Sequence, residues 1–318
     1  MRGTILASGL SAAAMLLTPA VAAGAQDAPS ITNPAAIHVA TGNDGSKRIT
    51  LPIHIDGKGP FNFVVDTGAE RTVISRELAT RLALVADTPV KLNSIGGISQ
   101  VDTVMIPRLS YGHGEMPDMQ APVLDADNLG AAGLLGLDGL ESKRLLIDFR
   151  KQKMEISNSS QPMFRDPDAI VVRARRRFGQ LVLVDSQANG EKIHVILDTG
   201  TERSIGNLAL LRKLTRKRKI DALRPVEMIS VTGDRLIGGW NVIEQVRIGG
   251  VNIKQLAVVF TDVSPFHQLG LDDRPALLLG MDVLRRFDRV AVDFGNKRVH
   301  FLLPDGAETD QGVRLASR

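Results

Sequence analysis

The sequence predicts a mostly β protein with two lobes of the same plan, related by an approximate twofold axis. Hydrophobic residues make up 43% of the chain but aromatic residues only 4%, so the core must consist mainly of Val, Ile and Leu, which favour strands. Short apolar runs alternate with Gly, Pro, Asn and Asp, as in strands joined by turns. One order of features also occurs twice, and 318 residues are enough for two such lobes.

The repeat is anchored on two similar stretches. Residues 63–74 read FVVDTGAERTVI, and residues 195–205 read VILDTGTERSI. Each is an apolar run followed by Asp-Thr-Gly and then Glu-Arg. The two aspartates are 198 − 66 = 132 residues apart, and two later Leu-Gly pairs are 280 − 136 = 144 apart. The sequence therefore predicts two lobes of similar size that differ by a few loop insertions.

The first residues have the composition of a targeting segment. Residues 1–25 contain one early Arg, an apolar middle and small residues at the end, which is typical of a secretory signal cleaved before Gln26. An uncleaved membrane anchor is the alternative, because residues 3–26 carry no charge and are long enough to span a bilayer. Residues 26–46 are polar and rich in turn formers, and we expect a flexible leader there, with an inhibitory role left open.

The first lobe is expected over residues 47–157. A helix should begin at Arg76 with Ser75 as its cap, and Gly96-Gly97 should close a hairpin. A short helix should follow residues 133–138. The expected strands cover residues 49–55, 61–65, 90–92, 101–106, 121–124 and 145–156.

A linker is expected over residues 158–170, a second lobe over 171–303 and a tail over 304–318. The second lobe repeats the first. It should contain a strand pair around Asn189-Gly190, a hairpin (229–242) around residues 232–234, a helix over 208–214, a strand over 251–260, a short helix after 277–282 and a closing strand over 290–294.

Two carboxyl groups in duplicated settings indicate a catalytic pair. Asp66 and Asp198, held close together, cannot both ionise, so one keeps its proton. The ionised carboxylate would then activate a water, and the protonated one would donate to a carbonyl oxygen. The alternative is that each Asp only caps a strand-end turn by accepting backbone amides. The shared apolar strand, Glu-Arg pair and Leu-Gly element favour catalysis.

The residues beside the aspartates fit this geometry. Thr67 and Thr199 are expected to lock the two turns together by hydrogen bonds. Gly68 and Gly200 allow the backbone to approach the carboxylates.

These motifs resemble those of a known family. Residues 64–69 (VVDTGA) and 196–201 (ILDTGT) look like the active-site motif of aspartic proteases, and residues 134–138 (LLGLD) and 278–282 (LLGMD) look like its second signature. The pattern is most similar to retropepsin-like bacterial proteins, including periplasmic aspartic proteases of proteobacteria. The resemblance covers about residues 47–303. It implies two retropepsin-like β-barrel lobes, the pseudo-twofold acid-protease fold, a catalytic dyad of Asp66 and Asp198, and no cofactor.

The resemblance also implies two flaps over the substrate. They would be the hairpins at Ile95, Gly96 and Gly97 and at Val231, Thr232 and Gly233, which would close over an extended peptide.

The chain departs from the family pattern at several positions. Ala69 follows the first Asp-Thr-Gly and Thr201 the second, so we expect a Thr201 hydroxyl bond to Asp198 and the shared proton more often on Asp66. Leu137 and Met281 stand where retroviral enzymes carry an Arg, so that family's ion pair does not carry over.

Other charged residues allow simpler interpretations. Asp138 and Asp282 are expected to cap the short helices that follow them. The pairs Glu70-Arg71 and Glu202-Arg203 either contact substrate or form internal ion pairs, and the sequence does not choose between these roles.

The amino-acid composition limits which cofactors and partners we expect for this protein. There is no cysteine, which excludes thiol nucleophiles, and the histidines lack metal-ligand spacing, so no metal is expected. Basic clusters at 173–177 and 212–219 are either a solvated face or a docking patch for an acidic protein or a membrane surface. Nucleic acid is not expected, because these clusters lack interleaved aromatic residues.

The sequence thus predicts an aspartic endopeptidase that hydrolyses extended protein segments, with limited proteolysis in the bacterial envelope and a periplasmic location. A single chain supplies both aspartates, so we expect a monomer. The alternative from a different class is an inactive peptide-binding or scaffold protein that keeps the fold.

Overall fold

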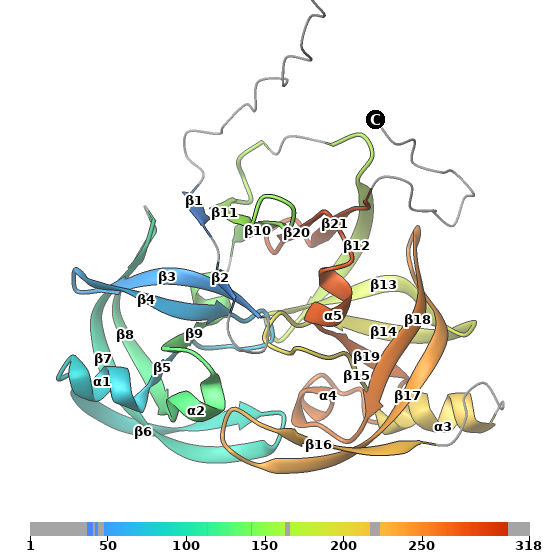
Figure 1. Cartoon of the computed structure of the whole chain (residues 1–318), viewed down its shortest axis with the longest axis horizontal. Helices are drawn as coiled ribbons and strands as arrows, with labels where there is room; N and C mark the ends of the chain where they lie inside the picture. Colours follow the sequence, from blue (N-terminus) through green and yellow to red (C-terminus); the bar gives the residue numbers. More distant parts are fainter. Residues whose placement is uncertain are drawn as a thin grey trace, which may run out of the picture. The chain divides into compact units, whose positions relative to one another are not determined.

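Strands dominate the structure, a computed structural model, with 57% of the described residues in strands and 13% in helices, which confirms the mostly β class. The residues described are 37–40, 42–43, 48–112, 114–140, 142–162, 166–216 and 223–304. All of them belong to one compact unit, Pro34–Arg318. Figure 1 shows how the strands of this unit are arranged.

The first lobe is a closed barrel. Its six strands follow the order β3-β4-β9-β5-β8-β7, and β7 pairs again with β3. They are β3 (Ile49–Ile55), β4 (Lys58–Val65), β5 (Val73–Ser75), β7 (Gly97–Tyr111), β8 (Gly114–Leu124) and β9 (Gly133–Leu135). Strands β2 (Gly42–Asn43) and β6 (Val85–Ser94) extend the sheet beyond the ring, and the helical segments are α1 (Arg76–Arg81), α2 (Ala126–Leu129) and η1 (Leu137–Gly139). Ser75 caps α1 as predicted, accepting a bond from the Leu78 amide at 3.1 Å.

The second lobe repeats this plan strand for strand. Its ring runs β13-β14-β19-β15-β18-β17 and closes from β17 to β13. The strands are β13 (Gln180–Ala188), β14 (Glu191–Leu197), β15 (Ile205–Gly206), β17 (Arg235–Ile248), β18 (Val251–Phe260) and β19 (Ala276–Leu279), and β16 (Arg224–Ile229) extends the ring as β6 does. The helices are α3 (Leu208–Arg216), α4 (Ser264–Gln268) and α5 (Met281–Leu284). The equal strand order confirms the two-lobed fold.

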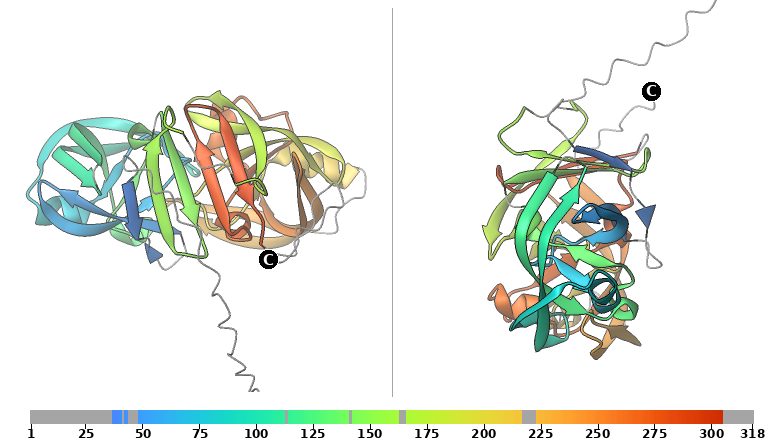
Figure 2. Two further views of the ribbon diagram at one scale, coloured as in Figure 1. Left: turned by 90° about the horizontal axis from the view of Figure 1, so that it is seen from above. Right: turned by 90° about the vertical axis from the view of Figure 1, so that its left-hand side faces the viewer.

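A third group of strands joins the lobes. It runs β1 (Ile37–Ala40), β11 (Lys153–Asn158), β10 (Lys143–Asp148), β20 (Arg289–Asp293), β21 (Arg298–Leu302) and β12 (Ile170–Arg177), in that spatial order. Figure 2 shows these strands side by side. Within this sheet the lobes meet at the antiparallel pair of β10 and β20.

The joining sheet differs from the sequence expectations in two places. The strand expected over 145–156 is two strands, because a turn forms where the Lys151 amide donates to Asp148 Oδ1 at 2.8 Å. Part of the expected flexible leader also forms β1 and β2, which pair with β11 and β3. An exposed strand edge presents unpaired backbone groups that accept such a segment.

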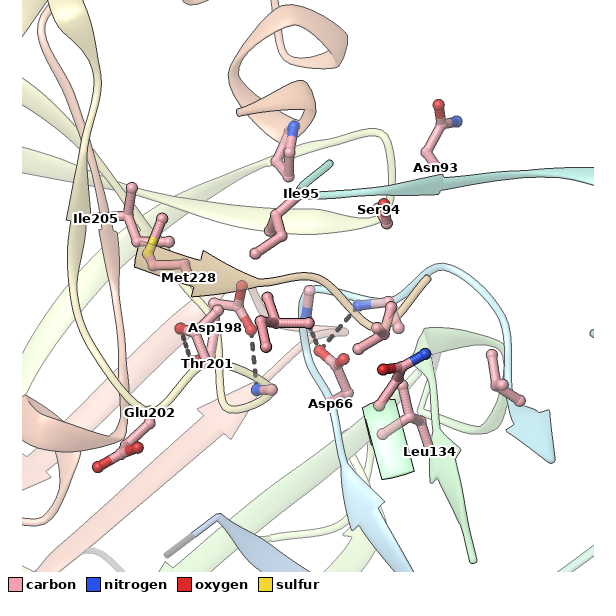
Figure 3. A pocket seen from close by; sticks show the side chains of 18 of the residues that line it. Asp66, Asn93, Ser94, Ile95, Leu134, Asp198, Thr201, Glu202, Ile205 and Met228 are labelled. Atoms are coloured by element: carbon pink, nitrogen blue, oxygen red, sulfur yellow. Dashed lines mark hydrogen bonds between the residues drawn. The ribbon is translucent and has the colours of Figure 1, made fainter. Parts of the chain in front are cut away.

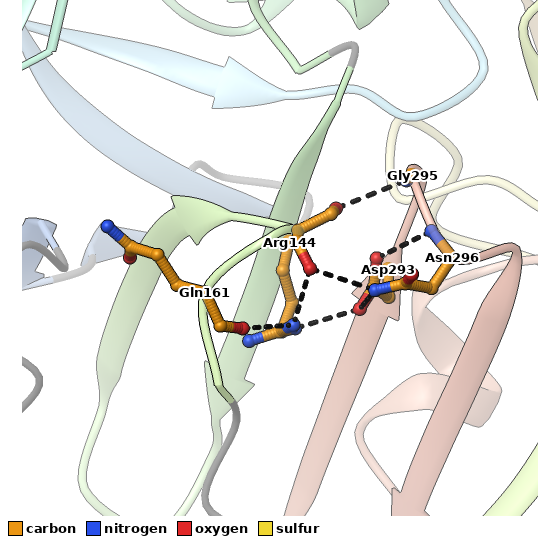
Figure 4. A network of polar contacts seen from close by, with 6 residues as sticks. Arg144, Gln161, Asp293, Gly295 and Asn296 are labelled. Atoms are coloured by element: carbon orange, nitrogen blue, oxygen red, sulfur yellow. Dashed lines mark hydrogen bonds and ion pairs between the residues drawn. The ribbon is translucent and has the colours of Figure 1, made fainter.

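A buried ion pair fixes the joining sheet (Figure 4). Arg144 Nε on β10 lies 2.9 Å from Asp293 Oδ2 on β20, and both side chains are almost fully buried. The guanidinium also donates to the carbonyls of Ser159 and Gln161, and Asn296 donates to Asp293. Burial favours a raised pKa for Asp293, but hydrogen bonds from Asn296, Ser159 and Arg144 hold it below its usual value. A buried pair with all its bonds satisfied keeps the lobes in one register.

Candidate active site

Each Asp-Thr-Gly turn of the repeat follows a buried strand. Residues 63–65 of β4 and 195–197 of β14 are fully buried, and in the barrel walls β4 and β14 pair in parallel with β9 and β19. The Asp66 amide donates to Leu135 O at 2.9 Å, and the Asp198 amide donates to Leu279 O at 3.1 Å. These bonds hold each aspartate at the end of its strand, where the chain turns.

The two turns are locked together by Thr67 and Thr199. The Thr67 amide donates to Thr199 Oγ1 at 3.0 Å, and the Thr199 amide donates to Thr67 Oγ1 at 3.1 Å. Each hydroxyl then donates to a carbonyl of the other lobe: Thr67 to Leu197 at 3.1 Å and Thr199 to Val65 at 2.6 Å. Both threonines are buried, so these bonds are shielded from water.

We expect Thr67→Ala to lower the free energy of unfolding by about 2–4 kcal/mol, since two bonds are lost and their buried partners remain unpaired. Urea unfolding measures this change. Thr201→Ala is the matched control, because the Thr201 hydroxyl reaches only the carbonyl of Asp198 in its own turn, at 3.4 Å. An equal loss in both variants would contradict the locking role.

The glycines of the turns bring the opposite carboxylate close. A Cβ atom on Gly68 would lie 2.8 Å from the Asp198 carboxyl carbon, and one on Gly200 would overlap the carboxyl of Asp66. Any side chain at these positions would therefore push the two aspartates apart. This contact is the structural reason for Gly in both motifs.

Asp66 and Asp198 lie together at the floor of one pocket (Figure 3). Asp66 Oδ1 accepts the amides of Gly68 at 2.8 Å and Ala69 at 3.0 Å, and Asp198 Oδ1 accepts the amide of Gly200 at 2.9 Å. Burial raises the pKa of both carboxyls above the ordinary value of 3.8. Burial and the neighbouring charge of Asp66 raise the pKa of Asp198 to about 8. Two such carboxyls hold one proton between them over a wide pH range.

The expected role of Thr201 is wrong. Its hydroxyl donates to the main-chain carbonyl of Asp198 and not to the carboxylate. The Thr201 hydroxyl therefore does not favour ionised Asp198, which removes the reason for expecting the shared proton on Asp66; burial raises the pKa of both carboxyls.

The pocket has a volume of about 440 Å³ and lies between the two lobes and the two hairpins. The predicted residues that line it are Asp66, Gly68, Ala69, Ile95, Asp198, Gly200, Thr201 and Val231. Apolar side chains of Leu92, Leu134, Ile205 and Met228 complete much of the wall.

The hairpins β6–β7 and β16–β17 meet at their tips above this pocket. Ser94 Oγ and Thr232 Oγ1 lie 2.9 Å apart, and Thr232 Oγ1 donates to Asp234 Oδ2 at 2.6 Å. Ile95 packs against an apolar cluster of the second lobe, and Val231 packs against one of the first. In Figure 3 Ile95 points towards the two carboxyls, whereas Asn93 points away from them.

The glycines at the two hairpin tips have different structural roles. Gly97 and Gly233 have positive φ, 130° and 87°, which the hairpin turns require. A Cβ atom on Gly96 would lie 2.6 Å from Asp234 Oδ2 of the other tip. Gly96, Gly97, Thr232 and Gly233 therefore shape the tips and their contact rather than the pocket wall.

The second-signature aspartates do not cap helices, so that prediction is wrong. The N-caps are Gly136 and Gly280. Asp138 accepts the amide of Thr72 at 2.8 Å and its hydroxyl at 2.7 Å, and Asp282 accepts the amide and hydroxyl of Ser204 at 3.1 and 2.8 Å. Each aspartate thus fixes the chain that leaves the motif in its own lobe.

The two Glu-Arg pairs line the pocket. Among the residues that the structure describes, no ion pair joins Glu70 to Arg71 or Glu202 to Arg203, and Figure 3 shows Glu202 pointing away from the carboxyls. Arg71 instead reaches Gln120 Oε1 at 3.4 Å. The internal ion pairs considered from the sequence are absent there.

Sequence reasoning missed two buried residues below the turns. Arg48 Nη1 donates to Gly200 O at 3.3 Å and Nη2 to Leu129 O, while Gln180 Nε2 donates to Gly68 O at 2.8 Å. Each precedes its motif aspartate by the same distance, 66 − 48 = 18 and 198 − 180 = 18. That equal spacing was the available signal.

The described segments contain no group of three or more His, Cys, Asp or Glu side chains able to hold a metal ion. Nor does this part of the chain include a helix long and apolar enough to cross a membrane.

Two family models match the chain. The one described as aspartyl protease matches residues 51–138, and the one described as gag-polyprotein putative aspartyl protease matches residues 184–286. Each match contains one Asp-Thr-Gly motif and one Leu-Gly signature, so the two matches follow the two lobes. No curated protein matches the chain. The chain belongs to the retropepsin-like aspartyl protease family.

Proposed function

We propose that the protein is an aspartic endopeptidase that hydrolyses peptide bonds of extended protein segments with a water activated by Asp66 and Asp198. The observation that carries this proposal is the contact of the two carboxyls across the lobes: the carboxyl of each lies against the turn glycine of the other. Both also have a raised pKa, as a shared proton requires.

The reaction follows from one ionised and one protonated carboxyl. The carboxylate takes a proton from water while the water oxygen attacks the carbonyl carbon, and the protonated carboxyl donates to the carbonyl oxygen. The C–N bond of the resulting tetrahedral diol then breaks: the leaving amine takes the proton that the base removed from water, and one diol hydroxyl returns its proton to the other carboxyl as the new C=O bond forms. Each product then leaves with its atoms complete, and the dyad returns to one shared proton.

The hairpins supply the binding surface for an extended segment. A peptide strand between the dyad and the flap tips can bond its backbone to the hairpins, as in β-strand addition. The apolar side chains in the wall, such as Leu134 and Met228, favour apolar substrate side chains beside the cut bond.

The test is to incubate the protein with a mixed peptide library from about pH 4 to about pH 10 and to read cleavage by mass spectrometry. We expect cleavage that falls as the pH passes about 8, because Asp198 then loses the proton it must donate. A variant with Asn at both positions 66 and 198 is the negative control. Folded protein that binds library peptides but cuts none would instead support the inactive peptide-binding protein.

We further propose that the protein is exported and carries out limited proteolysis in the bacterial envelope as a monomer. Export is supported by the composition of residues 1–25, which lie outside the described residues, and a monomer is supported by the presence of both aspartates in one chain. Sequencing the N-terminus of the mature protein from fractionated cells tests this proposal, and an intact N-terminus in the cytoplasmic fraction would contradict it.

The basic clusters remain a proposed contact for an acidic protein or a membrane surface. Arg173, Arg175 and Arg176 are exposed on β12. In the second cluster Arg212 and Lys213 lie 3.6 and 3.8 Å from Asp273 and Glu191, and residues 217–219 lie outside the described part. Sedimentation with anionic vesicles tests the membrane alternative.

A further inference from the structure

Arg48 and Gln180 occupy equivalent places in the two lobes but carry different charges. Arg48 directly precedes β3, and Gln180 is the first residue of β13, the equivalent strand. Both are buried, 7% and 5% exposed. Each donates to the carbonyl of the turn glycine in the opposite lobe, Arg48 to Gly200 and Gln180 to Gly68. At the two positions related by the pseudo-twofold axis, one lobe therefore carries a cation and the other a neutral amide.

This difference falls beside the dyad. The Gly200 backbone lies against the Asp66 carboxyl, so the Arg48 guanidinium bound to Gly200 is on the Asp66 side. The Gly68 backbone lies against the Asp198 carboxyl, where the bound side chain is the uncharged Gln180. A buried cation near one carboxyl favours its ionised form. In agreement, burial raises the pKa of Asp66 but Arg48 opposes that rise, whereas burial and the Asp66 charge raise the pKa of Asp198.

The other charged residues that line the pocket do not place a buried charge beside one of the two carboxyls alone. Glu70-Arg71 and Glu202-Arg203 are the same pair in each lobe. Lys91 and Glu227, on the two hairpins, are opposite in sign, but both are exposed, and Glu227 pairs with Arg235 at 2.8 Å. Exposed charges act weakly through water. Among the described residues that line the pocket, Arg48 is the buried cation.

We propose that Arg48, set against Gln180 in the other lobe, fixes the roles within the dyad: Asp66 is the ionised base that takes the proton from water, and Asp198 is the protonated acid. This inference rests on the proposed peptidase function. Arg48 acts through Asp66 and is a positioning residue.

The test is a carboxyl titration by NMR on the full chain labelled with ¹³C at the aspartate side chains. Signals that disappear in Asp66→Asn and Asp198→Asn assign the dyad. Arg48→Gln removes the charge and reproduces the donor of the other lobe, Arg48→Lys keeps the charge, and Gln180→Met removes the equivalent donor without changing charge.

In the unsubstituted protein Asp66 should ionise at lower pH than Asp198. In Arg48→Gln the Asp66 transition should move up by at least about one pH unit, as removal of a nearby buried cation predicts. Arg48→Lys should move it much less, and Gln180→Met should leave the order unchanged. The acidic limb of kcat/KM for peptide cleavage should move with the Asp66 transition.

An Asp198 that ionises first in the unsubstituted protein overturns the inference, even if Arg48→Gln does not fold. An unmoved Asp66 transition in folded Arg48→Gln also overturns it. The titration is read without substrate, so it separates this inference from the proposed function. Cleavage with an unmoved titration leaves the peptidase standing, whereas the expected titration without any cleavage refutes the peptidase alone.

Discussion

Replacing Asp66 or Asp198 by Asn is expected to lower kcat/KM for peptide cleavage by at least about a thousandfold, the scale of a lost general acid or base. An amide can neither take a proton from water nor share one with the opposite carboxyl. Each substitution alone should remove nearly all of the activity, because the two groups act as one unit and their effects do not add. Initial rates on a peptide identified from the library measure the change.

The matched control is Asp56→Asn. Asp56 is an exposed aspartate, 59% exposed, that pairs with Arg108 at 3.2 Å. Its φ of 47° is one that Asn adopts readily, so the fold and the rate should stay unchanged. Cleavage that survives in both Asp66→Asn and Asp198→Asn would mean that another group activates the water.

The parts of the fold that the sequence predicted are those with a local or repeated signal. The hairpin at Gly96-Gly97, the Ser75-capped helix and strand β18 each follow from residues adjacent in the chain. The sequence predicted that the two lobes pair because the motif occurs twice. The threonine of one Asp-Thr-Gly turn needs the other turn as its hydrogen-bond partner. Each of these features could be predicted from neighbouring residues or from the repeat.

The predictions that failed depended on which of several partners a polar group selects. Asp138 can cap a following helix or accept from Thr72, sixty-six residues earlier, and the sequence favours the local partner while the fold brings the distant one. The Thr201 hydroxyl likewise had two acceptors within its own turn and took the main-chain one. Segment β1 was missed because its strand partner β11 lies more than a hundred residues away.

Arg48 and Gln180 could have been found from the repeat. Aligning the copies on their aspartates places the two residues together, eighteen positions upstream. What the alignment does not give is that both are buried and reach the opposite turn. The charge difference was therefore visible, but its position beside the dyad was not.

The second large effect concerns stability. Asp198→Asn should raise the free energy of unfolding relative to the unsubstituted protein, by an amount that grows from about pH 4 to about pH 8 and reaches on the order of 5 kcal/mol, about 1.4 kcal/mol for each unit of the pKa shift. Below the ordinary pKa of 3.8 both folded and unfolded chains hold the Asp198 proton, and the group makes no difference. Above it the unfolded chain ionises while the folded chain keeps its proton until about pH 8. The unfolded state binds fewer protons across this window, so stability falls as the pH rises, and Asn removes that fall.

Urea unfolding of both proteins at several pH values measures the difference. The sign of the change in free energy of unfolding caused by Asp198→Asn separates two roles of Asp198. An aspartate that only caps a turn is more useful ionised, and its replacement would destabilise the protein more as the pH rises. A buried carboxyl that the folded protein keeps protonated for donation instead lowers stability at pH values where the unfolded chain ionises. Its replacement should remove activity and increase stability together, and a difference that stays constant or reverses between pH 4 and 8 would show that Asp198 holds no such proton.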